Sequence, residues 1–209
     1  MVLHRSSWTV IWKWFVSINR NMKKVVCFLT FLTFSFILSL VCYAQFVVTP
    51  NGIKTAEGKN YIVIKVEGKD KSSLYNDVLK YISMSYVSPK DVISSVESEM
   101  ISVNGISKIK DRAITYDMNY TIVFEFRDGR LKCSAPGINT MTGFIGDRQY
   151  ELTLNEYNGG FGSVCKVGIF NKRGDLCREV AKESIETFFN GLIVSLQRYL
   201  SECSKEDDW

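Results

Sequence analysis

Histidine is nearly absent from this chain of 209 residues: the only one is His4, near the N-terminus. The first 44 residues are predicted to be a leader, which would leave the exported domain with no histidine at all. That absence excludes Ser-His-Asp and Cys-His catalysis, histidine-ligated zinc and histidine pH switching in this domain. Any hydrolytic activity would have to rely on carboxylates alone.

The six cysteines contain no C-x-x-C pair, which argues against a metal or redox motif. Four of them follow the predicted leader: Cys133, Cys165, Cys177 and Cys203. In an oxidising compartment four cysteines allow three complete pairings, and the sequence does not choose among them. Buried thiols explain the same residues equally well.

Positive charge is also scarce outside the leader. Five basic residues precede Gln45, so residues 45–209 contain 21 Lys and Arg against 22 Asp and Glu, a net charge of −1 instead of the +4 of the whole chain. A domain without positive excess lacks the general electrostatic footprint of a nucleic-acid-binding protein. We therefore expect no nucleic-acid partner.

Residues 22–44 are typical of an export signal. Lys23 and Lys24 precede an uncharged apolar run, and the small residues Cys42 and Ala44 predict cleavage between Ala44 and Gln45. An uncleaved anchor stays open, because the run approaches the ~20 residues that cross a bilayer. A lipid anchor at Cys42 is a third alternative.

The positive-inside rule places the rest of the chain outside the cytoplasm in each case. We expect an exported protein of the periplasm, the outer envelope or the medium, or one anchored in the inner membrane with its domain outside. Membrane contact is expected only through the N-terminal segment, if it is not cleaved. Residues 1–21 are interpreted as an upstream mis-start, with Met22 as the true start, or as a cytoplasmic segment.

Beyond a polar lead-in at residues 45–60, the pattern predicts a single α+β domain at 61–200 and an acidic tail at 201–209. The expected fold is a curved antiparallel sheet with two main helices on one face. Strands are expected at 61–67, 92–96, 100–103, 106–109, 116–127, 130–135, 150–154 and 164–170, and helices at 72–86 and 178–200.

The boundaries of these elements come from local signals. Ser72 or Ser73 is expected to cap the first helix. Asn104-Gly105 and Asp128-Gly129 are typical of tight hairpin turns, and residues 136–147 are interpreted as a loop. The buried stripe of the second helix is expected to comprise Val180, Ile185, Phe188, Phe189, Leu192, Leu196 and Leu200.

Four stretches resemble a known family: Ile62–Gly68, Ser73–Ile82, Lys90–Ile93 and Tyr120–Arg130. The family is a domain of unknown function with a TATA-binding-protein-like fold, found in exported proteins of Gram-negative bacteria, and the resemblance spans roughly residues 52–138. It implies the fold described above. It implies no activity and no DNA binding, because a fold name does not transfer function.

Several candidate sites have a simpler structural interpretation. Gly159-Gly160-Phe161-Gly162 lacks the Lys-Ser/Thr ending of a phosphate loop and is interpreted as a hairpin loop. Glu97 and Glu99 share one face of a predicted strand and could form a glycosidase-like pair, although a solvated face is favoured. Asp207-Asp208 is a poor metal site, and Asn119 begins a glycosylation sequon of little weight in a bacterial chain.

Five tyrosines, Tyr61, Tyr75, Tyr81, Tyr86 and Tyr116, could form an aromatic binding surface or lie half-buried between sheet and helices. No catalytic, cofactor-binding or metal-binding residue is predicted, and no cofactor is expected. We expect a non-catalytic envelope module that binds a protein, peptide or glycan, or acts structurally, through the sheet face without helices. The alternatives are a carboxylate-only hydrolase and a membrane-anchored component of an envelope complex.

Overall fold

The computed structural model describes residues 46–155 and 164–206. The predicted leader, with its cleavage site at Ala44 and Gln45, lies outside these residues. Among the described helices, none combines the length and the apolar character needed to cross a membrane.

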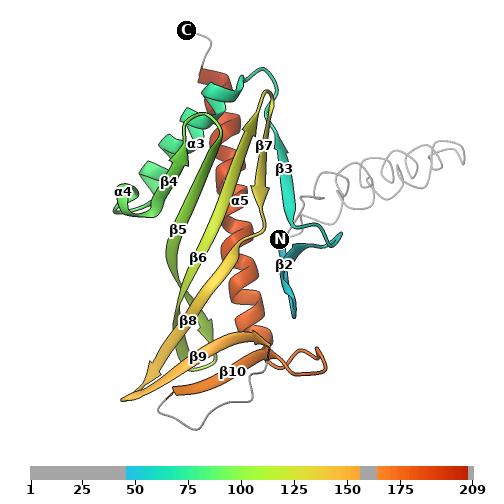
Figure 1. Cartoon of the computed structure of the whole chain (residues 1–209), viewed down its shortest axis with the longest axis vertical. Coiled ribbons are helices and arrows are strands. Elements are labelled where there is room, and N and C mark those ends of the chain that lie inside the picture. The colour runs from blue at the N-terminus through green and yellow to red at the C-terminus, as the bar shows by residue number, and fades with distance from the viewer. Residues whose placement is uncertain (1–45, 156–163, 207–209) are drawn as a thin grey trace, which may run out of the picture. The chain divides into compact units, whose positions relative to one another are not determined.

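The centre of the fold is the long strand β6 (Ile114–Arg127), which pairs with its neighbours on both sides. One edge of β6 pairs with β5 (Met100–Asp111) from Ile114 to Glu125, and the other edge pairs first with β8 and then with β7. The remaining strands extend this sheet outward from β5, β7 and β8 (Figure 1). Their bounds are β3 Tyr61–Lys65, β4 Ile93–Val96, β7 Arg130–Ser134, β8 Gly137–Ile145, β9 Arg148–Asn155 and β10 Val164–Phe170.

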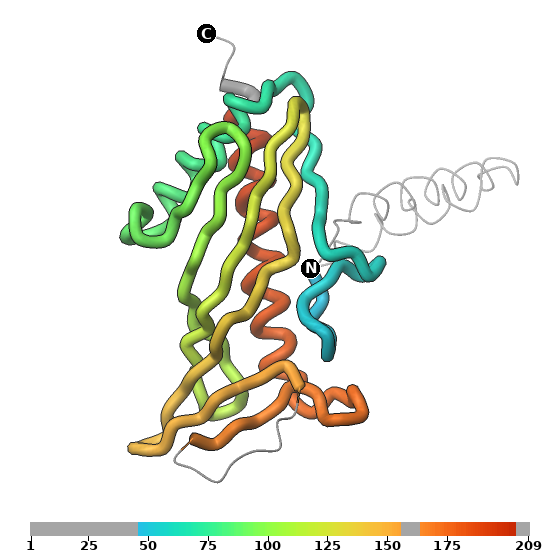
Figure 2. The backbone as a smooth tube through the Cα atoms, viewed as in Figure 1, coloured from blue at the N-terminus to red at the C-terminus, as the bar shows by residue number. Residues whose placement is uncertain are grey.

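One face of this sheet is buried and the other is open. Side chains on a strand alternate between the two faces, and the buried ones on β6 are every second residue. They are Tyr116, Met118, Tyr120, Ile122, Phe124 and Phe126. The tube of Figure 2 shows β5 and β6 running together across the long C-terminal helix.

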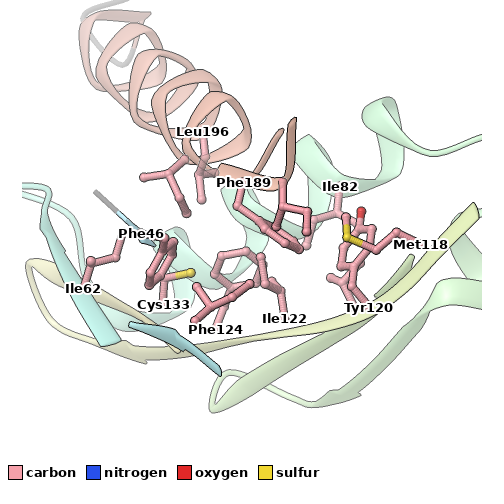
Figure 3. Packing of buried hydrophobic residues seen from close by; sticks show 14 of the residues in the cluster. Phe46, Ile62, Ile82, Met118, Tyr120, Ile122, Phe124, Cys133, Phe189 and Leu196 are labelled. Atoms are coloured by element: carbon pink, nitrogen blue, oxygen red, sulfur yellow. The ribbon is translucent and has the colours of Figure 1, made fainter. Parts of the chain in front are cut away.

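The helices α3 (Lys71–Ser85) and α5 (Glu179–Glu206) cover the buried face, and the short α4 (Pro89–Val92) follows α3. Leu74, Val78 and Ile82 of α3 meet the sheet, and from α5 come Ala181, Ile185, Phe189, Ile193, Leu196 and Leu200. Figure 3 shows Phe189 and Leu196 of α5 above Phe124 and Tyr120 of β6. The predicted α+β class, with an antiparallel-dominated sheet and a C-terminal helix, is confirmed.

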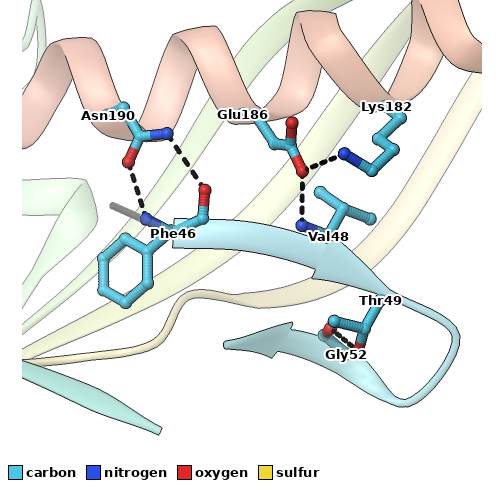
Figure 4. A network of polar contacts seen from close by, with 7 residues as sticks. All are labelled: Phe46, Val48, Thr49, Gly52, Lys182, Glu186 and Asn190. Carbon is cyan, nitrogen blue, oxygen red and sulfur yellow. Dashed lines mark hydrogen bonds and ion pairs between the residues drawn. The ribbon is translucent and has the colours of Figure 1, made fainter. Parts of the chain in front are cut away.

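The expected polar lead-in at 45–60 instead contains a hairpin of β1 (Phe46–Thr49) and β2 (Gly52–Thr55). Phe46, Val48 and Ile53 belong to the hydrophobic core. The backbone of β1 lies against α5, where side chains of Asn190 and Glu186 bind it (Figure 4). The prediction was wrong because Pro50, interpreted with Gly52 as a lead-in signal, lies in the turn of this hairpin, and Gly52 begins β2.

Two segments that contain glycine lie within strands, although one was expected to be a turn and the other a loop. Asn104 and Gly105 lie inside β5, and the segment 136–147 contains β8. A Cβ at Gly105 would lie 2.4 Å from Cζ of Tyr120, and a Cβ at Gly143 would lie 2.7 Å from the carbonyl oxygen of Thr115. These glycines make room for close neighbours, so they do not mark chain reversals.

Three further expectations are corrected. Strands β9 and β10 pair in parallel, whereas the sheet was expected to be antiparallel throughout. Asp70, not Ser72 or Ser73, caps α3, because its carboxylate accepts a hydrogen bond from the Ser73 N–H at 2.7 Å. Helix α5 continues to Glu206 into the expected tail, and Val180 is exposed, because Ala181 occupies the first buried position instead.

Candidate functional site

The open face of the sheet carries the side chains that alternate with the buried ones. On β3 these are Tyr61, Val63 and Lys65, and their burial alternates with that of Ile62 and Ile64. On β6 and β7 the same face carries Glu125, Arg127, Arg130 and Lys132. This corner of the open face, where β3, β7 and β6 lie side by side, is the candidate site (Figure 1).

Three cations are placed directly opposite one another in this corner. In the register of the sheet Lys65 pairs with Arg130, and Arg130 pairs with Arg127. All three side chains are exposed. We call Lys65, Arg130 and Arg127 the basic row.

The basic row lacks acidic partners. Among the described residues, no carboxylate forms an ion pair with any of its three side chains. The next cross-strand row is different, because there Lys132 forms an ion pair of 2.6 Å with Glu125. Like charges directly opposite each other across strands destabilise a sheet, so the basic row has a cost that its neighbouring row avoids.

A hollow of about 300 Å³ adjoins the row and is lined by Tyr61, Val63, Glu125, Arg127, Arg130 and Lys132. The Lys132 ammonium lies 5.4 Å from the centroid of the Tyr61 ring, within the range of a cation–π contact. The hollow therefore has an apolar wall from β3 and a positive wall from β6 and β7. Two guanidinium groups side by side present donors that match carboxylate or phosphate oxygens in pairs.

Two other hollows give weaker indications of a ligand. One of about 270 Å³ contains Arg112, Lys166 and Arg178, but Arg178 binds the buried Asp111 and Lys166 binds Glu151. The other, of about 660 Å³, lies against α3, α5 and β5 and is walled mainly by apolar and aromatic side chains. Since no charged side chain lines it, it does not indicate a class of ligand.

The sequence analysis did not identify the basic row. Part of the row could have been predicted from the segment Arg127-Asp128-Gly129-Arg130. A two-residue turn at Asp128-Gly129 places the flanking arginines opposite each other. The structure confirms that turn. Lys65 could not be added from the sequence, because its pairing with Arg130 joins segments 65 residues apart.

The predicted glycosidase-like pair is not on a strand. Glu97 and Glu99 lie in the turn between β4 and β5, where Ser98 has a φ of 56°. Both are exposed, and Glu99 approaches Lys71 at 4.0 Å. Neither lines the hollow at the basic row.

The five tyrosines do not form one surface. Tyr116 is fully buried, and Tyr75 packs edge-on against Phe126 in the core. The ring of Tyr81 contacts that of Tyr199, and the Tyr86 hydroxyl lies 2.8 Å from the Tyr120 hydroxyl. Only Tyr61 reaches the candidate site.

The remaining predicted residues lie elsewhere. Asn119 is on β6, where its side-chain amide donates to the Thr140 hydroxyl at 2.8 Å. Gly159–Gly162 and Asp207-Asp208 lie outside the described residues. In the part of the chain that the structure describes, no group of three metal-binding side chains is found.

The four cysteines of the domain are separate thiols in the structure: Cys133, Cys165, Cys177 and Cys203. Cys133 is completely buried on β7, and burial raises the pKa of its thiol far above the ordinary value. A thiol that stays protonated in the core is a poor nucleophile. A disulfide bond among Cys165, Cys177 and Cys203 stays a prediction.

No family model matches the chain, and no curated protein matches it. Among solved structures, the chain is similar to a TBP-like protein from Parabacteroides distasonis, with 14% sequence identity and a TM-score of 0.49. The match covers 68% of this chain and 90% of that chain.

Proposed function

We propose that this chain is an exported, non-catalytic binding module of the bacterial envelope, and that it holds an acidic ligand on the open face of its sheet. The basic row of Lys65, Arg130 and Arg127 carries the proposal. Three opposed cations without a carboxylate partner destabilise the isolated sheet, and an anion bound between them would remove that repulsion.

Protection against aggregation is the simplest competing explanation of such charges. Edge strands often carry lysine, which discourages pairing with another chain. That accounts for Lys65 on β3, whose one strand partner in the described part of the chain is β7. It does not account for Arg130, which has Lys65 of β3 on one side and Arg127 of β6 on the other.

The ligand class follows from the size of the cluster. Residues 45–209 have a net charge of −1, so no broad positive field surrounds the domain. Tight binding of nucleic acid usually neutralises several phosphates, ~6–10 in strong cases. Three cations beside a hollow of about 300 Å³ instead suit a few carboxylates on a protein or glycan.

Binding of a fluorescent acidic heptapeptide to the purified full-length protein tests the proposal. We expect Arg130→Glu to weaken binding at least tenfold, because it reverses the central charge of the row. Lys110→Glu is the matched control: Lys110 is an exposed cation of β5 on the same sheet, and its reversal is expected to leave the affinity unchanged. Equal affinity for all three proteins would refute the proposal.

Two further probes separate the ligand classes. A sulfated oligosaccharide and a single-stranded DNA oligonucleotide of equal charge are titrated under the same salt conditions. Preference for the peptide supports a protein ligand. Tighter binding of the oligonucleotide would contradict both the proposed ligand class and the expected absence of a nucleic-acid partner.

Export is a separate part of the proposal, supported by the signal-like pattern of residues 22–44. The intact mass of the native protein tests it. We expect a chain that starts at Gln45. A mass that retains the apolar run would instead show an anchored protein, and its partners would then be sought in the membrane. Nothing in the described part of the chain favours the hydrolase alternative, since Glu97 and Glu99 are exposed turn residues.

A further inference from the structure

We propose that the acidic ligand is an extended protein segment that adds to the free edge of β3 as an additional strand. This inference rests on the proposed function and specifies how the ligand is held. It joins two features that lie side by side, the unpaired backbone of β3 and the basic row next to it.

The hydrogen bonds around β3 show which of its backbone groups are free. Ala135 N–H donates to the Asn60 carbonyl, and Val66 N–H donates to the Gly129 carbonyl. In an antiparallel ladder, hydrogen-bonded pairs alternate with non-bonded pairs. Ile62 and Ile64 therefore bond to β7, and the N–H and C=O groups of Tyr61, Val63 and Lys65 point to the outer edge.

No other strand occupies this edge among the described residues. β3 pairs with β7 alone, and no backbone hydrogen bond in the described ranges reaches Tyr61, Val63 or Lys65 from another segment. Figure 1 shows β3 as the last strand on its side of the sheet, with the β1–β2 hairpin beyond its N-terminal end. A partner strand would satisfy these donors and acceptors as in other cases of strand addition.

The side chains of the same three residues favour this mode. Tyr61 is 41% exposed and Val63 is 48% exposed, so both keep apolar surface that a neighbouring strand could cover. A strand added beside β3 would cover them. Alternate side chains of that strand would lie on the open face, next to Lys65 and within reach of Arg130.

Charge decides between an acidic partner and a second copy of this chain. Of the charged side chains that line the hollow or belong to the basic row, Glu125 is the one acid, against Lys65, Arg127, Arg130 and Lys132. Two copies joined edge to edge at β3 would bring these positive corners together. A segment with carboxylates at every second position would neutralise them.

Backbone methylation of the ligand tests strand pairing without changing charge. The probes are a heptapeptide of alternating Glu and Val and two versions N-methylated at all odd or all even positions. An added strand uses only every second N–H of its own to bond β3. We expect one methylated version to bind like the parent and the other to bind at least tenfold more weakly.

The failures of the two proposals are distinguishable. If both methylated versions bind like the parent while Arg130→Glu still abolishes binding, the site recognises charge only and strand addition is refuted. If the parent peptide does not bind at all, the proposed function itself fails. Loss of binding with both methylated versions would also count against strand addition, since one set of amides faces away from β3.

A protein variant gives an independent check. Val63→Pro removes an N–H from the outer edge of β3 and leaves every charge in place. We expect at least tenfold weaker binding of the parent peptide, with an unchanged circular dichroism spectrum. The peptide series keeps the test valid if this variant does not fold. Sedimentation of the unmodified protein and of Val63→Pro, both without peptide, tests for pairing between two copies. A dimer that Val63→Pro disrupts would assign the edge of β3 to a second copy and overturn the inference.

Discussion

Gly105 and Gly143 show how much a single residue decides in this sheet. Both lie inside strands, and both are approached by groups that a side chain would strike. The ring of Tyr120, whose hydroxyl lies 2.8 Å from that of Tyr86, occupies the space above Gly105. Tyr120 is buried, so its ring has little freedom to move away.

Gly105→Ala is expected to lower the free energy of unfolding by about 1–3 kcal/mol, the usual cost of overpacking a core. Gly191→Ala is the matched control, because no atom lies within 4 Å of its added Cβ and Gly191 is inside α5. That variant is expected to gain ~0.5–1 kcal/mol from better helix propensity. Urea denaturation measures both, and a neutral Gly105→Ala would show that Tyr120 can shift.

Asp111 and Arg178 form the most buried ion pair among the described residues. The Asp111 side chain is 1% exposed, and the Arg178 guanidinium binds one of its carboxylate oxygens. Within the described ranges, the other carboxylate oxygen has no hydrogen-bond partner, and neither does the buried hydroxyl of Tyr116. Burying a charge is costly unless it is paired, so this carboxylate depends on Arg178.

Arg178→Ala is expected to destabilise the fold by about 3–5 kcal/mol, because it leaves a buried carboxylate without a counter-charge. The double variant Asp111→Leu with Arg178→Met removes both charges and keeps the apolar bulk. It is expected to recover most of that loss. Thermal melting of the single and the double variant measures both losses of stability. Equal destabilisation would mean that lost packing, and not the unpaired charge of Asp111, explains the effect of Arg178→Ala.

At the level of elements, α5 does more than cover the sheet, because its polar side chains take the place of a strand beside β1. The Asn190 amide accepts from the Phe46 N–H at 2.8 Å and donates to the Phe46 carbonyl at 3.0 Å (Figure 4). Glu186 accepts from the Val48 N–H at 2.8 Å and from the Lys182 ammonium at 2.6 Å. Side chains of a helix thus supply hydrogen-bond partners for the backbone groups at the edge of a two-stranded hairpin.

Asn190→Ala is expected to cost about 1–3 kcal/mol, because two half-buried backbone groups of Phe46 lose their partners. If the effect is local, hydrogen exchange becomes faster at the Phe46 amide. The amides of β6 then exchange no faster than the loss of global stability alone would cause. Asn190→Asp separates the two bonds, since its carboxylate still accepts from the Phe46 N–H but no longer donates to the Phe46 carbonyl. Uniformly faster exchange across β6 as well would contradict a local role.

For the whole molecule, the hairpin of β1 and β2 belongs to the same hydrophobic core as the sheet. A domain that begins at Tyr61, as the sequence pattern predicts, would lack Phe46, Val48 and Ile53. Burial of a large apolar side chain contributes about 1.5–3 kcal/mol, part of which is offset by the entropy of ordering the hairpin.

A chain of residues 61–209 is therefore expected to be less stable than residues 45–209 by on the order of 4 kcal/mol. Guanidinium denaturation of the two chains, followed by circular dichroism, measures the difference. The longer chain also represents the predicted exported form. Equal midpoints would show that the hairpin is an appendage and not part of the core.

Much of the architecture could be predicted from local patterns. The alternation in β6 and the helical spacing in α5 are visible in a short window, because burial repeats every second residue in a strand and about every 3.6 in a helix. The errors concern residues whose role depends on distant neighbours. Asn104-Gly105 and residues 136–147 carry turn signals, yet Tyr120 and the backbone of Thr115 require those glycines within strands.

The α+β class, most of the elements and the Asp128-Gly129 turn could be predicted from the sequence, which also shows that residues 45–209 contain no histidine. These follow from composition and from interactions between residues close in the chain. Three features became visible only in the folded chain: the parallel pairing of β9 with β10, the place of the β1–β2 hairpin and the alignment of Lys65, Arg130 and Arg127. The reason is physical: strand order and register are set by packing between segments far apart in the chain, and a one-residue change in register would turn every side chain to the other face.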